Sequence, residues 1–194
     1  MKKIALALIT SAVALGAASV QAQELKPYVG AGVVGTSNKY NLPNDTSGGD
    51  TKSTEYGGKI FGGVQIDKTW GVEAGYVDFG KQSYDYTTNA GTGSIESKSK
   101  SYYLAGKGTF PINQQFAVTG KLGVAHNTNK VNATGLALAY DSDNSRNALY
   151  ASVGAEYAFT DKLSGVLEYE HFGKNEVDQG RRKGAINLGV KASF

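Results

Sequence analysis

Residues 184 to 194 read Gly184-Ala-Ile-Asn-Leu-Gly-Val-Lys-Ala-Ser-Phe194, and an apolar residue occupies every second position of this stretch. The apolar set is Ile186, Leu188, Val190, Ala192 and Phe194. Because successive side chains of a strand point to opposite faces, this pattern predicts a strand with one apolar face and one polar or small face. Such a strand fits either the edge of a soluble sandwich or the closing strand of a barrel with lipid outside and a wet interior.

The same alternation recurs in seven earlier segments, so the chain is expected to hold eight strands. The predicted strands are Pro27 to Ser37, Ser53 to Ile66, Trp70 to Lys81, Lys98 to Phe110, Gln115 to Asn127, Arg146 to Phe159, Leu163 to Lys174 and Gly184 to Phe194. The pattern blurs at Asp78 and Phe79, which indicates a bulge.

Tight turns and longer polar stretches alternate between these strands. The expected turns are Asp67 to Thr69, Pro111 to Gln114 and Thr160 to Lys162; the expected loops are Asn38 to Lys52, Gln82 to Ser97, Thr128 to Ser145 and Asn175 to Gly180. Short turns at one end and long loops at the other are typical of outer-membrane barrels. We therefore predict an all-β, eight-stranded, antiparallel up-and-down transmembrane β-barrel.

Aromatic residues gather near the predicted turns and the C-terminus, at Trp70, Phe110, Phe116, Phe159 and Phe194. In a closed barrel they would form a belt at one membrane face. Each predicted strand also has the roughly 9 to 11 residues that a tilted strand needs to cross a bilayer. A soluble sandwich would not need aromatic residues at one end, so these observations favour the barrel.

The N-terminus carries the features of a secretory signal. Met1-Lys2-Lys3 is a basic start, Ile4 to Ala18 is apolar or small, and Val20-Gln21-Ala22 suits a signal peptidase. We expect residues 1 to 22 to be removed and residues 23 to 194 to form one barrel domain. Loss of Lys2 and Lys3 would lower the formal net charge from +3 to +1, so the basic composition does not indicate a nucleic-acid partner. The chain contains no cysteine, which excludes disulfides and thiolate chemistry.

The polar parity of the strands would point into the barrel. It contains charged residues of both signs: Lys59, Glu73, Lys107, Lys121, Glu156, Glu168, Glu170, Arg181, Lys183 and Lys191. The interior of an eight-stranded barrel is nearly filled by side chains, so these groups are expected to form a salt-bridge network. The network could simply fill the lumen or could gate a narrow ion path, whereas a wide aqueous pore would need about twice as many strands.

The sequence also contains an internal repeat, consistent with a hairpin unit of about 45 residues. Gly71-Val-Glu-Ala-Gly-Tyr-Val-Asp-Phe-Gly-Lys81 resembles Gly165-Val-Leu-Glu-Tyr-Glu-His-Phe-Gly-Lys174.

Several segments, in their order and spacing, resemble the transmembrane domain of the OmpA-like family, and the similarity covers essentially the whole mature chain. They are Phe61-Gly-Gly-Val-Gln-Ile66, Gly71-Val-Glu-Ala-Gly-Tyr76, Ala105-Gly-Lys-Gly-Thr-Phe-Pro111, Gly154-Ala-Glu-Tyr-Ala-Phe159, Leu167-Glu-Tyr169 and Leu188-Gly-Val190. Other small barrels, of the OmpX/Ail and opacity types, share this architecture and remain alternatives.

The resemblance implies a lumenal Glu/Lys/Glu/Arg cluster that blocks or gates the barrel. Glu73, Lys107 and Glu168 match three of its members, and Arg181, or the adjacent Arg182, matches the fourth. Together with Lys121 and Glu170, the expected lumenal network is Glu73, Lys107, Lys121, Glu168, Glu170 and Arg181. The resemblance further implies that Phe194 is the aromatic signal read by the outer-membrane assembly machinery.

Two departures from the family are expected to matter. The chain ends at the barrel, which would leave out the family's periplasmic peptidoglycan-binding domain. Gly32 stands where the family tends to have a lumenal lysine, which would alter the charge network.

The functional hypothesis is an integral outer-membrane protein of Gram-negative type, without catalysis or cofactor, which supports the envelope and displays loops for recognition or adhesion. The loops contain Tyr40, Tyr84, Tyr86 and Tyr140 among small polar residues, a composition suited to contact. The expected partners are outer-membrane lipid and lipopolysaccharide, the assembly machinery, and a host or surface ligand. The first alternative is a small gated ion channel.

The second alternative is a lipid A-modifying hydrolase, because His126 and His171 fall on the lipid-facing parity near the loop-side ends of their strands. In the eight-stranded hydrolases a serine nucleophile lies two residues after such a histidine. Here that position is Gly173, which offers no hydroxyl for His171 to activate. The sequence has no clustered metal ligands.

Overall fold

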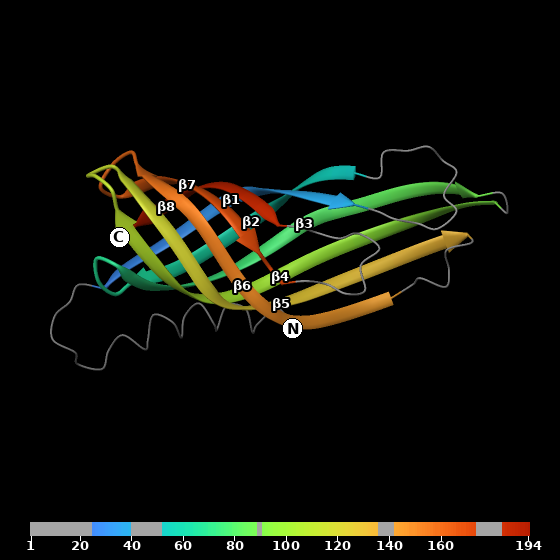
Figure 1. Cartoon of the computed structure of the whole chain (residues 1–194), viewed down its shortest axis with the longest axis horizontal. Helices are drawn as coiled ribbons and strands as arrows, with labels where there is room; N and C mark the ends of the chain where they lie inside the picture. Colours follow the sequence, from blue (N-terminus) through green and yellow to red (C-terminus); the bar gives the residue numbers. More distant parts are fainter. Residues whose placement is uncertain (1–24, 40–51, 89–90, 136–141, 174–183) are drawn as a thin grey trace.

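The computed structural model describes residues 25–39, 52–88, 91–135, 142–173 and 184–194. Within these ranges eight strands pair in chain order and β8 pairs with β1, so the sheet closes into a barrel (Figure 1). Every neighbouring pair is antiparallel, including the closing pair. The predicted all-β, up-and-down barrel is confirmed. The strands are β1 (Lys26–Lys39), β2 (Lys52–Gln65), β3 (Trp70–Thr88), β4 (Gly91–Pro111), β5 (Phe116–Gly135), β6 (Ser142–Ala158), β7 (Leu163–His171) and β8 (Ala185–Ser193).

The period-two pattern separates the two faces of the barrel wall. In β8, Ile186 and Leu188 are 56% and 65% exposed, whereas Ala185 and Asn187, at the alternate positions, are buried. In β7 the charged residues Glu168 and Glu170 are buried, while Leu167 and Tyr169 are exposed. The outside of this barrel is therefore apolar and its inside polar, the reverse of a soluble protein.

Three tight turns at one end of the barrel share one hydrogen-bond pattern. The side chain of the second of the four residues between the strands accepts hydrogen bonds from the backbone N–H groups two and three positions later. Asp67 accepts from Thr69 and Trp70, Asn113 from Gln115 and Phe116, and Thr160 from Lys162 and Leu163. The N–H groups of Trp70 and Thr69 lower the pKa of the Asp67 carboxyl. Short polar side chains at these positions thus fix the turns through local backbone contacts, and the three predicted turns are confirmed.

The strands on one side of the barrel are longer than the sequence pattern predicted. Residues 82–88 continue β3 and pair with residues 91–97 of β4, and the pairing runs from Gln82 opposite Ser97 to Thr88 opposite Gly91. Residues 128–131 of β5 likewise pair with residues 142–145 of β6. The predicted loops Gln82 to Ser97 and Thr128 to Ser145 are therefore wrong over the described residues. These segments are rich in Ser, Thr, Asn and Lys, a composition typical of loops. The hydrogen bonds between strands satisfy the backbone N–H and C=O groups whatever the side chains are.

The remaining loop predictions concern residues that lie mostly outside the described ranges. Asn38 and Lys39 belong to β1 and Lys52 to β2, while residues 40–51 and Asn175 to Gly180 are not described. Tyr84 and Tyr86 lie on β3 rather than in a loop, and Tyr40 and Tyr140 lie outside the described residues. So do the predicted signal segment and Lys174, the expected end of the seventh strand.

The expected irregularity in β3 is a bulge. The register with β4 shifts between Asp78 and Lys81, and Gly80 within the shift has φ +82°. The Asp78 carboxylate accepts a hydrogen bond from the Gly80 N–H at 3.0 Å. A positive φ suits glycine because it has no Cβ, and the bulge turns Phe79 into the barrel, where it is buried. Across the described residues there is no helix long and apolar enough to cross a membrane.

The turn pattern predicts the effect of removing one cap. Asn113→Ala deletes the acceptor of two backbone N–H groups, at 2.9 Å from Gln115 and 2.8 Å from Phe116. We expect the free energy of unfolding to fall by about 1 kcal/mol, measured by urea titration of the protein refolded into lipid vesicles. Gln114→Ala, at the next exposed position, is the control and should leave the midpoint unchanged. Equal midpoints for the two variants would show that the cap contributes nothing.

Candidate functional site

The candidate site is a network of charged side chains that fills the turn-side half and the middle of the barrel interior. It consists of four lysines and four glutamates: Lys59, Glu73, Lys107, Lys121, Glu156, Glu168, Glu170 and Lys191. All are buried except Lys191, which is partly exposed. They come from every strand except β1, because each strand points every second residue inward. The network itself contains four positive and four negative groups.

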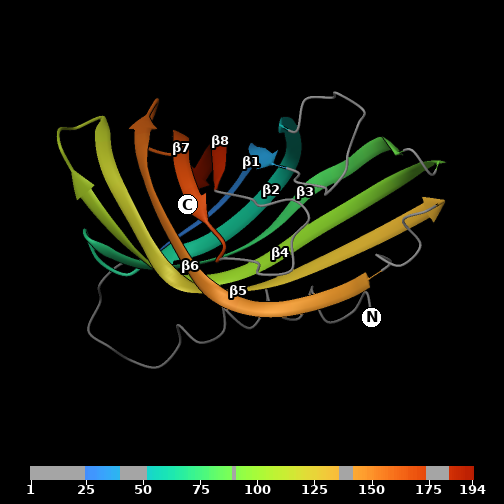
Figure 2. The same ribbon diagram turned by 45° about the vertical axis from the view of Figure 1, so that its right-hand side comes forward.

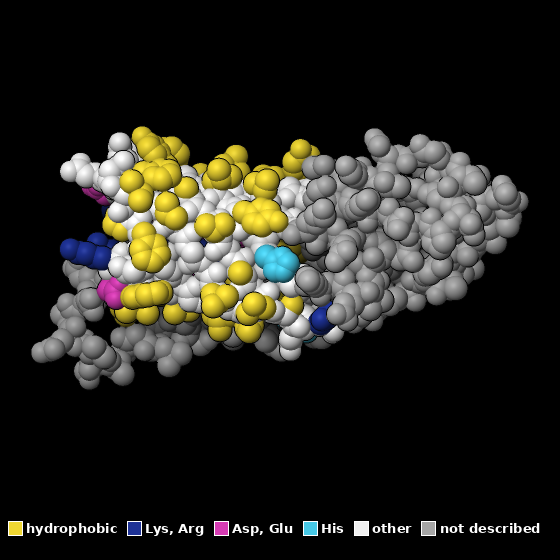
Figure 3. Space-filling model, viewed as in Figure 1, with side chains coloured by type: hydrophobic (Ala, Val, Ile, Leu, Met, Phe, Trp, Pro, Cys, Tyr) yellow, Lys and Arg dark blue, Asp and Glu magenta, His cyan; other side chains and the backbone are white. Residues whose placement is uncertain are grey.

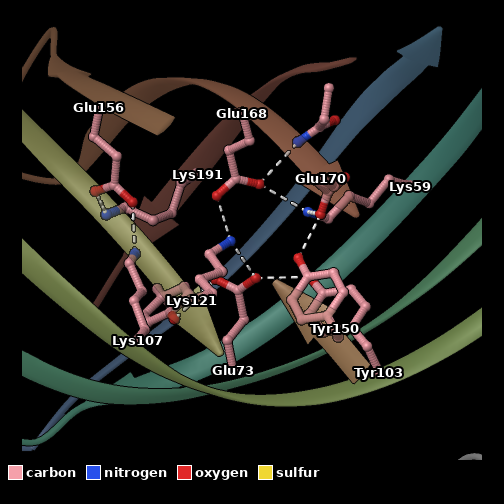
Figure 4. A network of polar contacts seen from close by, with 12 residues as sticks. Lys59, Glu73, Tyr103, Lys107, Lys121, Tyr150, Glu156, Glu168, Glu170 and Lys191 are labelled. Atoms are coloured by element: carbon pink, nitrogen blue, oxygen red, sulfur yellow. Dashed lines mark hydrogen bonds and ion pairs between the residues drawn. The ribbon is translucent and has the colours of Figure 1, made fainter. Parts of the chain in front are cut away.

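Five of these residues form an alternating chain across the barrel (Figure 4). The Lys121 ammonium lies 2.6 Å from Glu73 and also contacts Glu168. The Lys59 ammonium lies 2.8 Å from Glu168 and 2.7 Å from Glu170. Each lysine therefore bridges two glutamates, and Glu168 joins the two bridges. The order of charges, Glu73–Lys121–Glu168–Lys59–Glu170, places opposite charges next to each other throughout.

The other three residues form a second group nearer the turns. The Glu156 carboxylate accepts from Lys107 at 2.5 Å and from Lys191 through its other oxygen. This group carries one excess positive charge, and the five-membered chain carries one excess negative charge. The balance is therefore reached only when the two groups are taken together.

Tyrosine hydroxyls and one amide provide further hydrogen bonds to the carboxylates. Tyr28 and Tyr103 donate to Glu73 at 3.0 and 2.6 Å, and Tyr150 donates to Glu170 at 2.5 Å. Asn187 donates to Glu168 at 3.3 Å. These bonds replace the water that an ionised carboxylate loses when it is buried.

Aromatic rings cover the lysine ammonium groups. Lys107 lies 4.7 Å from the centre of the Tyr28 ring, and Lys59 lies 5.0 Å from the Phe61 ring. A ring face attracts a cation, most strongly where water is excluded. Each buried charge thus has protein partners of opposite or complementary polarity, as a buried ion pair requires.

The residues singled out from the sequence lie as follows. Glu73, Lys107, Lys121, Glu168 and Glu170 point into the barrel and form ion pairs with one another or with neighbouring charges. Lys107 contacts Glu156, which the expected six-residue network did not include, rather than Glu73 or Glu168. Arg181, Arg182 and Lys183 lie outside the described residues. Phe194 is 73% exposed, and its backbone N–H donates to the Pro27 carbonyl at 3.0 Å; its role in assembly stays a prediction.

The two histidines lie on the wall rather than in the network. His126 is exposed on β5 and its Nδ1 lies 2.7 Å from the Asn147 side-chain oxygen, while His171 ends β7 and is partly buried. The described residues contain no group of three or more His, Cys, Asp or Glu that could hold a metal ion.

The outer wall carries aromatic residues at both ends. On the turn side Trp70, Phe110, Phe116, Phe159 and Phe194 are all exposed, as the sequence pattern predicted. On the loop side Tyr56, Tyr102 and Tyr169 are also exposed. The sequence reasoning missed this second belt, although its members share the parity of the apolar residues. Between the two ends, apolar side chains cover the described wall, and charged side chains gather toward its ends (Figure 3).

An apolar wall between two aromatic belts, closed around a charged interior, defines a membrane-spanning β-barrel. The model of the family "Outer membrane protein beta-barrel domain" matches residues 5–194. The chain belongs to this family, and the protein is located in the outer membrane.

Among curated proteins, the chain is 29% identical over 204 residues to outer membrane protein A of Shigella flexneri, covering all of this chain and 56% of that protein. It is 26% identical over 200 residues to outer membrane protein A of Salmonella typhi, with the same coverage. The chain thus spans about half the length of the curated relatives it matches.

Two crystal structures share the fold. Ail, the attachment invasion locus protein of Yersinia pestis, gives a TM-score of 0.57 at 17% identity over 89% of this chain and all of that chain. OprG from Pseudomonas aeruginosa gives a TM-score of 0.58 at 14% identity over 87% of this chain and 95% of that chain. At these identities the likeness shows an OmpA-like eight-stranded barrel architecture and no more.

The ion pairs predict a large cost for removing a central lysine. Lys121→Met leaves Glu73 and Glu168 without the ammonium between them, and breaking a buried pair on one side typically costs about 3 to 5 kcal/mol. We expect the urea midpoint of the variant in lipid vesicles to fall accordingly. Lys68→Met, on the exposed turn between β2 and β3, is the matched control. A Lys121→Met midpoint equal to that of the control would mean that the network does not stabilise the barrel.

Proposed function

We propose that this protein is a non-enzymatic structural component of the outer membrane that presents an extended sheet for recognition or adhesion. The observation that carries the proposal is the unequal length of the strands. β3, β4, β5 and β6 continue well beyond the level at which β7 and β8 meet the rest of the barrel (Figures 1 and 2).

The extended sheet consists of residues 81–88, 91–98, 130–135 and 142–143. β3 pairs with β2 only as far as Asp78, and beyond that residue it pairs with β4 alone, up to Thr88. β6 pairs with β7 only from Ala151, so its first residues pair with β5 alone. In outer-membrane barrels the short turns face the periplasm and the long connections face outside. The extended sheet therefore lies on the cell surface, where a partner can reach it.

Lysines form a row across this sheet. Lys81 lies opposite Lys98, and Lys98 lies opposite Lys130; Lys100, on the next outward position of β4, is exposed. The Glu96 carboxylate lies 3.1 Å from the Lys98 ammonium and the Asp78 carboxylate lies 3.6 Å from the Lys100 ammonium, so acidic groups offset part of the charge. A row of cations on neighbouring strands suits a linear polyanion. Ail, which has the same fold, is described in complex with the heparin analogue sucrose octasulfate. A sulfated polysaccharide is thus the first ligand class to test.

The proposal predicts that adhesion depends on the extended sheet. Replacing residues 82–97 by Asn-Gly joins Lys81 to Lys98, which already face each other, through a turn that suits a hairpin. We expect the barrel to fold and cells displaying it to lose adhesion to heparin-coated surfaces. Albumin-coated surfaces are the control, and retained adhesion would contradict the proposal.

A charge variant separates recognition by lysines from recognition by shape. The triple variant Lys81→Gln, Lys98→Gln, Lys130→Gln keeps the sheet but removes the row, and we expect it to bind heparin severalfold more weakly. Lys68→Gln, at the opposite end of the barrel, should bind as the unmodified protein does. A triple variant that binds as well as this control would exclude the lysine row as the ligand site.

The absence of catalysis is part of the proposal. Position 173 is glycine and has φ +85°, so no hydroxyl follows His171 at the spacing that the lipid A hydrolases use. His126 contacts Asn147 rather than a carboxylate or a hydroxyl. We expect lipid A incubated with the purified protein to keep its mass in mass spectrometry. Loss of an acyl chain, absent from a protein-free sample, would overturn this part of the proposal.

We further propose that the apolar wall contacts outer-membrane lipid and lipopolysaccharide, and that Phe194 is read by the assembly machinery. The exposed apolar wall and the exposed Phe194 support these roles. A narrow ion path is the second candidate function, because two groups of ion pairs line the interior. Such a path would run along the lumen past both groups of ion pairs.

A further inference from the structure

A layer of aromatic side chains lies on the loop side of the charge network. We define the aromatic layer as Phe79 of β3, Tyr103 of β4, Tyr150 of β6 and Phe172, the residue after β7; each is at most 5% exposed. On β4, Tyr103 lies four residues from Lys107 on the loop side. On β6, Tyr150 lies six residues from Glu156 on the loop side. The barrel interior therefore has a charged part and an apolar part, one above the other.

The four rings contact one another across the lumen. Tyr103 stacks on Tyr150 with ring centres 4.3 Å apart and an angle of 15° between the planes. Phe172 packs edge-on against Phe79 at 5.2 Å and 86°, and lies 5.2 Å from Tyr150. The wall around the rings is mixed. Val34, Val77, Ala125 and Ala185 are buried there, and so are the polar residues Thr36, Ser101 and Asn127. Thr36 pairs with Ala185, and Ser101 pairs with Val77 and Asn127. The layer thus joins residues of six strands and the segment after β7.

The sequence repeat accounts for the two phenylalanines. In both copies a phenylalanine precedes a glycine with positive φ, Phe79 before Gly80 at +82° and Phe172 before Gly173 at +85°. β3 and β7 are separated by three strands in either direction around the closed sheet, so they lie opposite each other. The two copies therefore project their phenylalanines toward the same point from opposite walls.

The two tyrosines connect the aromatic layer to the charge network. The Tyr103 hydroxyl donates to Glu73 and the Tyr150 hydroxyl to Glu170 (Figure 4). Their hydroxyl ends are thus polar and satisfied, while their rings belong to the apolar layer. An ion that left the charged part toward the loops would have to pass between these packed rings, of which Phe79 and Phe172 have no polar side-chain atom.

We propose that the aromatic layer, and not the ion-pair network, is the barrier that closes the lumen to ions. An apolar constriction excludes water, and the attraction of a ring face for a cation returns only a small part of the desolvation cost of an ion. The ion pairs lie in a polar environment of hydroxyls and carboxylates and present no such barrier. Opening an ion pair would leave the aromatic layer closed. The inference concerns permeability and is independent of the proposed adhesion.

The test is the conductance of purified variants in planar lipid bilayers. We expect the double variant Phe79→Ala, Phe172→Ala to raise the time-averaged conductance at least severalfold over the unmodified protein. Lys107→Ala and Glu168→Ala, which disturb the ion pairs, should remain as closed as the unmodified protein. The inference is overturned if the double variant stays closed, or if either ion-pair variant conducts as well as the double variant.

A second variant distinguishes wetting of the layer from formation of a cavity. It also tests the inference if the double variant does not fold. Phe172→Gln removes less volume than Phe172→Ala and makes the side chain polar, and it should also raise conductance, because the layer can then hold water. Tyr150→Phe keeps the ring in the layer and removes only the hydroxyl, and it should stay closed. Folding of each variant is checked by the heat-dependent shift in electrophoretic mobility. A folded Phe172→Gln with unchanged conductance overturns the inference even if the double variant does not fold.

These outcomes are distinguishable from failure of the adhesion proposal. None of the substitutions touches the extended sheet, so heparin adhesion of the double variant should equal that of the unmodified protein.

Discussion

The rest of the structure depends on the pairing of charges inside a barrel too narrow to hold much water. Eight strands enclose an interior that side chains nearly fill, and an ionised group without a partner there costs several kcal/mol. Four lysines face four glutamates. Lys121 bridges carboxylates of two different strands, Glu73 of β3 and Glu168 of β7. Lys59 bridges Glu168 and Glu170, which are alternate residues of β7. Each bridge joins residues far apart in the chain, for example Lys59 and Glu170. The network is satisfied only when all strands are in register, so it favours the closed barrel over partly paired sheets.

The same alternation that builds the network builds the lipid-facing wall. A strand such as β7 places Glu168 and Glu170 inside and Leu167 and Tyr169 outside. A shift of one residue in register would exchange the two sets, exposing charges to lipid and leaving apolar groups among ion pairs. The lipid outside and the ion pairs inside therefore favour the same strand register. In the extended sheet the sequence shows no such alternation of apolar and polar residues.

This difference explains what the sequence could and could not predict. Where one face meets lipid, the period of two is clear, and it assigned the inward position of Lys59, Glu156 and Glu168 correctly. In residues 91–97 the sequence lacks this alternation although the strand ladder continues, so the pattern predicted a loop where the chain forms a strand. Ion-pair partners were also beyond sequence reasoning. Lys107 and Glu156 lie on β4 and β6, and their contact depends on the register and tilt of the strand between them.

The two phenylalanines of the repeated Phe-Gly pair meet only because the sheet is closed and the barrel is narrow. In an open sheet, Phe79 and Phe172 would lie four strands apart and could not meet. In the closed order β3 and β7 are opposite, and in an eight-stranded barrel the diameter is small enough for two rings to pack edge-on at 5.2 Å. In a barrel with twice as many strands the same motif would leave an open lumen. A local sequence signal, a glycine that tolerates positive φ after an aromatic residue, thus becomes a seal because the strand count sets the distance it has to span.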